Sequence, residues 1–448
     1  MNVKFIAVGL VAILIVAGSA VFLLAGDDDE NQLPKNEDGR LMIFGNATND
    51  DYLDEDDLEL IESIAKGSVQ WDKTKNPYAD ANHDGEVNFA DVEFVKRLIA
   101  RESMDIWYVD GDNKVQQIHY PLKTIAIVGT QQMIAAQAMG ILDKVAGVSG
   151  TPLVFDNVLH KTLSTRPSIS NSPTKIDITM YSNVAQTVLG GIDAVLCAAS
   201  GLTSQQEACD QAGITLVRMD SSTLKGEIRT FLTFGYLMQN EKRSHDLAQF
   251  IDAFNADMNK KLDTIPDDKR ITSLVLSSNT KSFMGGLVCS NTRAFSERVN
   301  LVGTHNNITN ADLGNDEKKM IAEGDVWHLS AKYQSDVVVD MVTGFGYNTT
   351  AEDFAKFWER IFEAPEFSMT KMSAYPNGFA VISRDIPGPV MMGYYAEFFY
   401  PEVFGEGYGD KVHQAWCDRF FEDLGPDFDA SKQIILCTYD DVKDLLKK

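Results

Sequence analysis

Short runs of Val, Ile and Leu alternate with helix-like stretches over most of the chain after Ser103. Strands that helices bury on both faces have this composition, so the pattern predicts an α/β fold with parallel sheets. Asp110-Gly111 lies between two strand-like flanks and predicts a hairpin before the first of these strands. The predicted strands are KTIAIVG (123–129), DAVLCAAS (193–200), ITLVRMD (214–220), ITSLVLSS (271–278), DVVVDMV (336–342) and GFAVISR (378–384).

One helical pattern is much longer than the others. Apolar positions recur at helical spacing over residues 226–263, and the pattern ends before Pro266, which cannot continue a helix. This helix separates the strands into a set before it and a set after it. We therefore predict two α/β lobes, at residues 106–225 and 267–448, joined by a connecting helix at 226–266.

The chain begins with an uncharged apolar run. From Phe5 to Gly26 there is no charged side chain, and about 20 such residues span the core of a bilayer. Lys4 precedes the run and acidic residues follow it, which predicts that the rest of the chain lies outside the cell membrane. A cleaved signal peptide and a retained membrane anchor at 1–26 both fit, and the length of the run favours the anchor. The acidic residues 27–40 are expected to form a solvated linker.

The stretch YADANHDGEVNFADVEF, residues 78–94, has the spacing of a calcium-binding loop that leads into a helix. Calcium takes six to eight oxygen ligands, and such a loop supplies them from fixed positions around one ion. Gly85 provides the sharp turn at position 6 of the loop. The predicted ligands are Asp80, Asn82, Asp84, the Glu86 carbonyl, Asn88 and Asp91.

A weaker copy of the loop lies 34 residues upstream, beginning at Asn46 where the other begins at Asp80. Asp51 stands in place of the glycine, and Asn46 stands in place of the first carboxylate. Both loops have an alternative interpretation as acidic helix caps, because Asp and Asn satisfy the free N–H groups at the start of a helix. The candidate ligands in this copy are Asn46, Thr48, Asp50, the Tyr52 carbonyl, Asp54 and Asp57.

The two loop–helix units have Asp, not the longer Glu, at their last ligand position, and over residues 41–103 they resemble a type I dockerin. The resemblance implies a small all-α module, at residues 41–105, that calcium folds and that binds a cohesin-type domain of another protein. The alternative is a spacer that packs against the neighbouring lobe of its own chain.

The charge and the motif content narrow the function. The 448 residues carry a net charge of −25, which opposes binding to the phosphates of nucleic acids. The five cysteines lack CxxC spacing, so neither a zinc site nor a disulfide framework is predicted. The motifs GxSxG, HExxH and GxxxxGK[ST] are absent, and the seven histidines show no metal-binding spacing. These observations predict a protein that is not an enzyme.

The α/β part resembles class III periplasmic-type substrate-binding proteins in the order of its segments, over about residues 105–440. It departs from them where Gly191-Ile192-Asp193 and Ser335-Asp336 replace the usual Pro-Asp before a strand. The resemblance implies two Rossmann-like lobes that capture a ferric siderophore, haem or cobalamin and deliver it to an ABC permease. The similar segments are DGDNKVQQIHYPLKTIAIVG, AMGILDKVAGVSG, TRPSIS, YSNVAQTVLGGIDAVLCAA, RVNLVGTHNNIT, SAKYQSDVVVDMV and GPVMMGYYAEFFYPEVF.

Ligands of open α/β lobes bind at the loops beyond the carboxyl ends of the strands, which predicts a site in the cleft between the lobes. Arginines there suit anionic chelates, and aromatic rings suit the faces of macrocycles. As alternatives, Arg384 belongs to a surface ion pair and Trp327 to a core. The candidate ligand-binding residues are Thr130, Gln131, Arg166, Ser200, Phe283, Met284, Trp327, His328, Tyr375 and Arg384.

Two functions from different classes follow. The first is an extracytoplasmic substrate-binding protein of an ABC importer, held at the membrane by its N-terminal helix and carrying structural calcium. The second is a cell-surface interaction protein whose dockerin-like module recruits a cohesin-type partner.

Overall fold

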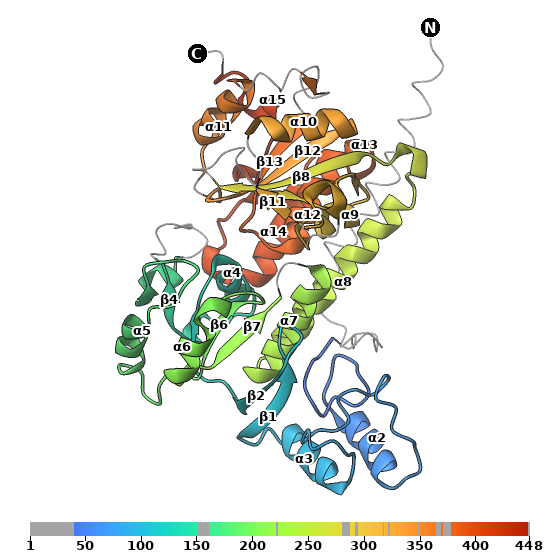
Figure 1. Cartoon of the computed structure of the whole chain (residues 1–448), viewed down its shortest axis with the longest axis vertical. Helices are drawn as coiled ribbons and strands as arrows, with labels where there is room; N and C mark the ends of the chain where they lie inside the picture. The colour runs from blue at the N-terminus through green and yellow to red at the C-terminus, as the bar shows by residue number, and fades with distance from the viewer. Residues whose placement is uncertain are drawn as a thin grey trace. The chain divides into compact units, whose positions relative to one another are not determined.

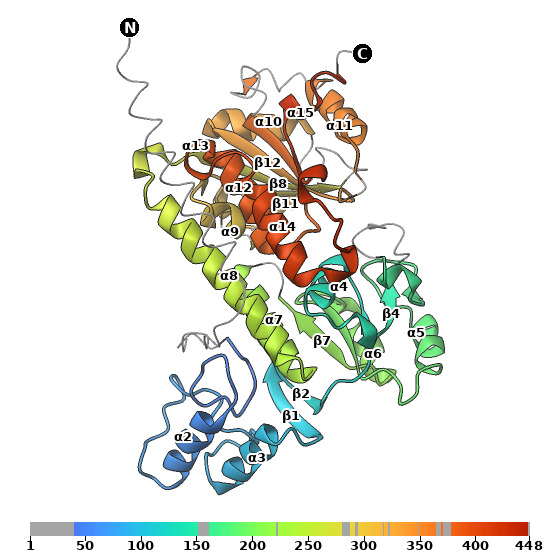
Figure 2. The same ribbon diagram turned by 180° about the vertical axis from the view of Figure 1, so that it is seen from behind.

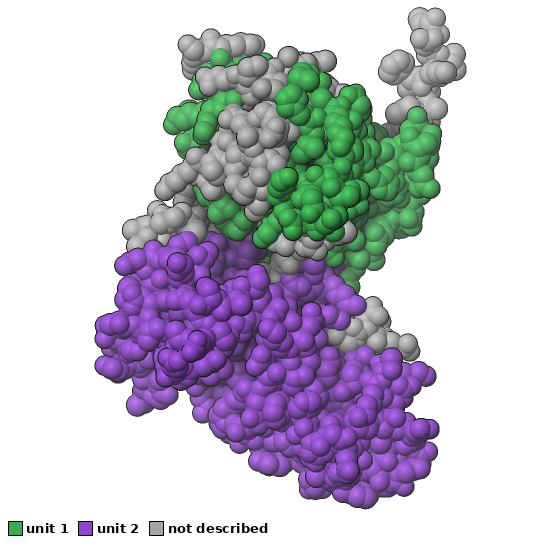
Figure 3. Space-filling view, in the orientation of Figure 1, with its two compact units in different colours: residues 1–27, 153–161, 252–448 green, residues 28–152, 162–251 purple. Residues whose placement is uncertain are grey.

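The computed structural model describes residues 40–446 apart from 151–160, 221–222, 280–286, 292–293, 317, 321–322, 348, 364–368 and 371–377. Its described residues divide into two compact units, coloured separately in Figure 3. The N-terminal unit comprises those of 28–152 and 162–251, and the C-terminal unit comprises 161 and those of 252–446. The predicted signal or anchor segment, 1–26, lies outside the described residues. Within them, no helix combines the length and the apolar character needed to cross a bilayer.

The N-terminal unit is built on a five-stranded parallel sheet (Figure 1). The strand order in the sheet is β5-β4-β3-β6-β7. The chain therefore adds β4 and β5 on one side of β3, and then returns to add β6 and β7 on the other side of β3. This is the doubly wound arrangement, and the predicted Rossmann-like lobe is confirmed for this unit. The strands are β3 (Ile125–Ile127), β4 (Val145–Ser149), β5 (Ser168–Ser170), β6 (Ala194–Ala198) and β7 (Leu216–Met219).

Apolar side chains on the strands explain why helices cover this sheet. Ala126, Val195 and Cys197 are fully buried and form one cluster with side chains of the flanking helices, including Val184 and Cys209. The helices of the unit are α4 (Thr130–Ala138), α5 (Ile178–Ala185), α6 (Gln206–Gln211), α7 (Leu224–Leu237) and the first half of α8 (Glu241–Leu262).

The long helix expected at 226–263 is interrupted, so this prediction is wrong in its continuity. α7 ends at Leu237 and α8 begins at Glu241, with Gln239 between them in the left-handed region at φ 54°. The Asn240 amide nitrogen donates to the Met139 carbonyl at 2.6 Å, a contact that fixes the break against the end of α4. No glycine or proline marks the break, and therefore the hydrophobic pattern runs through it. α8 itself contributes residues to both units.

The predicted hairpin is present as the antiparallel pair β1 (Met104–Val109) and β2 (Val115–Tyr120). Asp110 holds its turn by accepting hydrogen bonds from the backbone N–H groups of Asp112 and Lys114, each at 2.9 Å. Gly111 donates to the Arg218 carbonyl at 2.9 Å. A side chain at Gly111 would lie 2.5 Å from a backbone nitrogen of Asp220, so only glycine permits this contact with β7.

The C-terminal unit contains a mixed seven-stranded sheet in which β8, β12 and β13 form a parallel centre. β10 pairs with β8 in parallel, whereas β9, β11 and β14 add antiparallel edges. The strands are β8 (Thr272–Asn279), β9 (Leu287–Cys289), β10 (His305–Asn306), β11 (Lys318–Met320), β12 (Val337–Thr343), β13 (Phe379–Ser383) and β14 (Leu436–Cys437).

Helices cover both faces of this second sheet, as Figures 1 and 2 show. α10, α11 and α15 pack on one face, where Trp358 and Phe354 meet Leu274, Val338 and Phe379 in a single buried cluster. α9, α12 and α14 lie on the other face. The helices are α9 (Ala294–Leu301), α10 (Glu323–Tyr333), α11 (Ala351–Glu363), α12 (Gly388–Phe399), α13 (Pro401–Phe404), α14 (Tyr408–Phe420) and α15 (Tyr439–Val442).

A carboxyl group lies at the centre of this sheet. Asp340 on β12 has no exposed surface, and its Oδ2 accepts a hydrogen bond from the Ser278 hydroxyl at 2.8 Å. Its Oδ1 has no hydrogen-bond partner among the described residues. Burial raises the pKa of Asp340 to about 7, because removal from water penalises the ionised form.

We predict that Asp340 makes the protein less stable as the pH rises. The unfolded chain releases this proton near pH 4, whereas the folded chain keeps it until about pH 7, so the free energy of unfolding falls across that interval. Three pKa units correspond to about 4 kcal/mol. Denaturant unfolding of the wild type and of Asp340→Asn between pH 4 and 8 should show a loss that is larger in the wild type by about this amount, because Asp57 contributes equally to both proteins. Exposed Asp268→Asn is the control, and parallel curves for wild type and Asp340→Asn would contradict the prediction.

Candidate functional site

Three of the predicted ligand-binding residues lie where the N-terminal sheet changes direction. β3 and β6 pair in parallel, and the chain leaves them toward opposite sides of the sheet. Thr130 and Gln131 open α4 directly after β3, and Ser200 follows β6 with its side chain exposed. Such switch points at the carboxyl ends of strands leave a crevice that suits ligands. The structure therefore brings these three residues to one edge of one sheet, as predicted.

The start of α4 is held in place by the neighbouring strand. Gly129 precedes the helix at φ 108°, and its N–H donates to the Ser149 hydroxyl at 3.2 Å. Ser149 lies at the end of β4 and in turn donates to the Pro173 carbonyl at 3.0 Å. The residue before the helix, Gly129, has no side chain that could cap it, and the helix begins just after the end of β3. This arrangement suits a negatively charged or acceptor group.

Gln132 is a candidate that the sequence analysis missed. Its side chain is 2% exposed, and its amide nitrogen is buried without a hydrogen-bond partner among the described residues. An unpaired buried donor is destabilising, and such groups are retained where a ligand or a water completes them. In the sequence Gln132 is an ordinary helix residue beside Gln131, so no pattern distinguishes it.

Arg166 does not join this edge. It precedes β5, and the carboxyl ends of the strands lie at the opposite edge of the sheet. Its Nη2 donates to the Leu142 carbonyl at 3.0 Å, just before β4. The sequence TRPS was expected to follow a strand, but the strand is the short β5 that comes after it. The placement of Arg166 among the carboxyl-end residues was therefore wrong.

In the C-terminal unit, Arg384 has the predicted position. It follows β13 directly, is partly buried, and donates its backbone N–H to the Val342 carbonyl near the end of β12 at 3.2 Å. Trp327 and His328 lie within α10, not in a loop after a strand, and the His328 side chain is exposed. Phe283, Met284 and Tyr375 lie outside the described residues.

The two predicted calcium loops share one hydrogen-bond pattern. In the second loop, Asp80 accepts from the N–H of Asp84 at 3.0 Å, and Asp91 accepts from those of Asn82 and Asn88 at 3.1 and 2.8 Å. In the first loop, Asn46 accepts from Asp50, and Asp57 accepts from Thr48 and Asp54. The helices α2 (Glu55–Ala65) and α3 (Phe89–Ile99) follow, each with a capping box from the end of its loop.

The charges of the two loops differ. In the second loop, burial and the neighbouring carboxylates of Asp80 and Asp84 raise the pKa of Asp91, so three acidic side chains lie close together there. In the first loop, Arg40 forms a buried bidentate ion pair with Asp51 at 2.8 and 2.5 Å. Burial raises the pKa of Asp57 in that loop to about 7. The second loop thus fits a divalent cation better than the first.

The carboxylates are not gathered as they are around a metal ion. No group of three or more His, Cys, Asp or Glu side chains converges at metal-binding distance in the described part of the chain. In the second loop the remaining ligands expected are amide and backbone oxygens, and Gly85 makes the turn at φ 100°. Calcium binding stays a prediction for both loops.

The loop–helix module packs against its own lobe, as the spacer alternative anticipated. Its chain joins the hairpin, where Phe44 donates to the Trp107 carbonyl at 3.0 Å and Val109 donates to the Met42 carbonyl at 2.9 Å. Its other contacts reach α7 and α8. These contacts are Met42 N to Thr233 Oγ1 (3.1 Å), Tyr236 Oη to Leu98 O (3.3 Å), Arg101 with Glu241 (2.6 Å) and His245 Nε2 with Asp51 O (3.0 Å).

Comparisons with known proteins give a fold and no closer relative. No protein-family model matches the chain, and no curated protein matches it. Among solved structures, the TroA-like periplasmic binding protein FepB from Veillonella parvula matches 74% of this chain and 99% of its own, with TM-score 0.54 and 14% identity. CeuE from Helicobacter pylori in a Ni-His complex matches 72% of this chain and 97% of its own, with TM-score 0.54 and 14% identity.

A third structure belongs to the same group. The molybdate periplasmic binding protein MolA from Haemophilus influenzae, bound to molybdate, matches 70% of this chain and 98% of its own, with TM-score 0.55 and 10% identity. In each case nearly the whole of the neighbour is covered. The chain therefore has the fold of TroA-like class III periplasmic solute-binding proteins of ABC transporters.

Proposed function

We propose that this protein is the extracytoplasmic solute-binding component of an ABC importer, held at the membrane by residues 1–26. The observation that carries the proposal is the combination of this fold with candidate ligand-binding residues at the carboxyl edge of the N-terminal sheet. Thr130, Gln131 and Ser200 follow the paired strands β3 and β6 at one edge of one sheet, and the buried amide nitrogen of Gln132 has no hydrogen-bond partner among the described residues. Among the solved neighbours, FepB is a periplasmic binding protein, and a further one, from Sulfurospirillum deleyianum, is an ABC transporter solute-binding protein.

The ligand that fits best is an anionic metal chelate, a ferric siderophore or haem, with cobalamin as the neutral alternative. The backbone N–H groups at the start of α4 and the side-chain amide of Gln132 are donors, and donors bind the carboxylate or catecholate oxygens of such ligands. In the C-terminal unit, Arg384 lies at the corresponding place, the carboxyl end of β13. The MolA structure shows that this fold also accommodates an oxyanion.

We predict that at least one ligand among ferric siderophores, haemin and cobalamin quenches the tryptophan fluorescence of the full chain, and that the quenching is saturable. The variant Gln132→Leu should keep or raise the thermal midpoint, because it removes an unpaired buried donor, and should bind the same ligand roughly tenfold more weakly. Arg97→Gln, which alters an exposed ion pair with Glu102, is the matched control and should bind as the wild type.

The titration separates the proposal from its alternatives. Absence of a saturable response to all three ligand classes would remove the proposed function. A response that Gln132→Leu leaves intact would retain the binding function but exclude the α4 edge as the site.

We further propose that the second loop binds calcium as a structural ion. The carboxylates of Asp80, Asp84 and Asp91 support this, since a divalent cation would neutralise their charge and its coordination bonds would join the loop to α3. The ion would act on the lobe through the module, which touches α7 and α8. No observation favours a cohesin-type partner, and that alternative stays a prediction.

Calcium is expected to raise the thermal midpoint of the full chain relative to the same protein in EGTA. Asp84→Asn should weaken calcium binding strongly, because it removes a ligand charge of the second loop. Asp50→Asn in the first loop should have a smaller effect, and Asp72→Asn, in the segment between the loops, should have none. Calorimetric titration with calcium measures all three, and equal losses for Asp50→Asn and Asp84→Asn would contradict the difference between the loops.

A further inference from the structure

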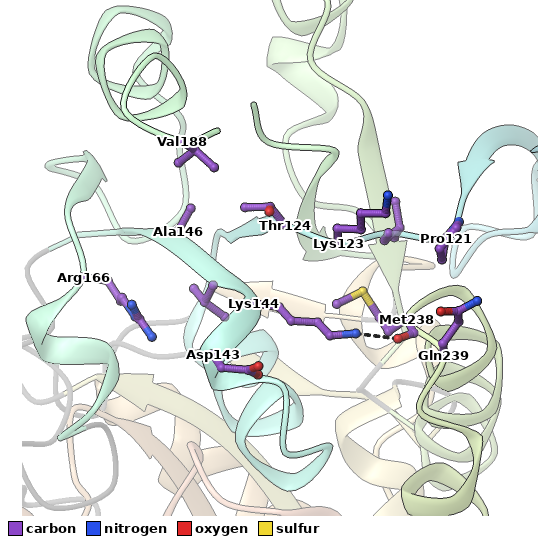
Figure 4. Close-up of a pocket in the computed structure, with 12 residues that line it drawn as sticks. Pro121, Lys123, Thr124, Asp143, Lys144, Ala146, Arg166, Val188, Met238 and Gln239 are labelled. Carbon is purple, nitrogen blue, oxygen red and sulfur yellow. Dashed lines mark hydrogen bonds between the residues drawn. The ribbon is translucent and has the colours of Figure 1, made fainter. Parts of the chain in front are cut away.

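A pocket of about 480 Å³ lies at the edge of the N-terminal sheet that the proposed ligand site does not use (Figure 4). Its lining comes from the residues that precede the strands: 121–124 before β3, 143–144 before β4 and Arg166 before β5. Val145 and Ala146 at the start of β4, Val188 after α5, and residues 238–239 after α7 complete the lining. The amino ends of the strands form this edge, so the pocket is separate from the carboxyl-end site.

Cations outnumber carboxylates in this lining. Lys123, Lys144 and Arg166 contribute positive charge, and Asp143 is the one acid among the lining residues. The chain as a whole carries a net charge of −25, so the excess of positive side chains in this pocket is opposite in sign to the net charge of the protein. A small pocket with a local positive surplus attracts anions, because nearby low-dielectric walls concentrate its field.

Two of the cations are held in place by backbone carbonyls. The Lys144 ammonium donates to the carbonyl of Met238, where α7 ends, at 2.5 Å, and the Arg166 Nη2 donates to the Leu142 carbonyl at 3.0 Å. The Arg166 Nε is buried and has no hydrogen-bond partner among the described residues. Figure 4 shows Arg166 at one side of the pocket and Lys144 reaching across toward Met238, while the Lys123 ammonium points away from Lys144.

The donors that remain define the ligand class. A guanidinium has five N–H donors and an ammonium has three, and the described contacts of each use only one. Carboxylate and phosphate groups match a guanidinium through paired hydrogen bonds. Pro121, Val188 and Met238 add apolar surface beside the charges. We propose that this pocket is a second binding site, for a small organic anion that joins a carboxylate or phosphate to a short apolar group.

The site is tested with phenyl phosphate and benzoate as probes, and with phenol as the neutral comparison. Saturation-transfer NMR on the full chain should show saturable binding of the two anions and none of phenol. Arg166→Gln should weaken phenyl phosphate binding about tenfold, as expected for the loss of one charge-assisted contact. Arg97→Gln, which replaces an exposed arginine of the same unit, is the control and should leave phenyl phosphate binding unchanged.

A second variant protects the test against misfolding of Arg166→Gln. Asp143 is exposed, and Asp143→Asn removes the one negative charge of the lining, so this variant should bind phenyl phosphate several-fold more tightly. Equal binding of phenol and phenyl phosphate, no saturable binding by the wild type, or an Asp143→Asn variant that binds no better would each overturn the site. Chelate titration of the same samples is an independent measurement, so failure here leaves the proposed import function in place.

Discussion

Burial of α7 on nearly every side is the constraint on which the N-terminal unit depends. Twelve of its 14 residues are buried. At its end, α7 accepts a hydrogen bond at the Leu237 carbonyl from the N–H of Leu122, at 2.8 Å. Its Thr233 and Tyr236 side chains bond to the backbone of Met42 and Leu98 in the loop–helix module. A helix with apolar residues on all faces must be enclosed, because water would otherwise meet its phenylalanines and leucines. The module is therefore part of the core of this unit and not a freely tethered domain.

This enclosure also determines how the two edges of the sheet differ. The end of α4 is held at the break between α7 and α8 by the hydrogen bond from the Asn240 amide to the Met139 carbonyl. α4 begins at the carboxyl edge of the sheet, so this bond fixes its other end. The carboxyl edge presents helix N–H groups and the Gln132 amide, whereas the amino edge presents the lysine and arginine side chains that cap carbonyls. The proposed chelate site and the proposed anion pocket thus lie at opposite edges of the same sheet.

The sequence predicts the elements whose signal is local and repetitive. Buried strands such as β8 and β12 contain short Val/Leu runs, and the alternation of such strands with helices indicates the α/β class. The break at Gln239 was missed because a left-handed residue that is not glycine leaves no mark in the sequence. Arg166 was misplaced because β5 has three residues, too few for a periodic signal. Gln132 was missed because burial of a polar helix residue is decided by tertiary packing.

The central claim is that ligand binds at the carboxyl ends of the strands, and hydrogen–deuterium exchange of the full chain with and without a bound ferric chelate tests it most directly. The account predicts slower exchange on binding in the peptides that cover 128–133 and 384–388. The backbone N–H groups of these peptides lie at the carboxyl ends of β3 and β13, where a bound ligand would protect them. Unchanged exchange in both peptides, with protection elsewhere, would contradict it.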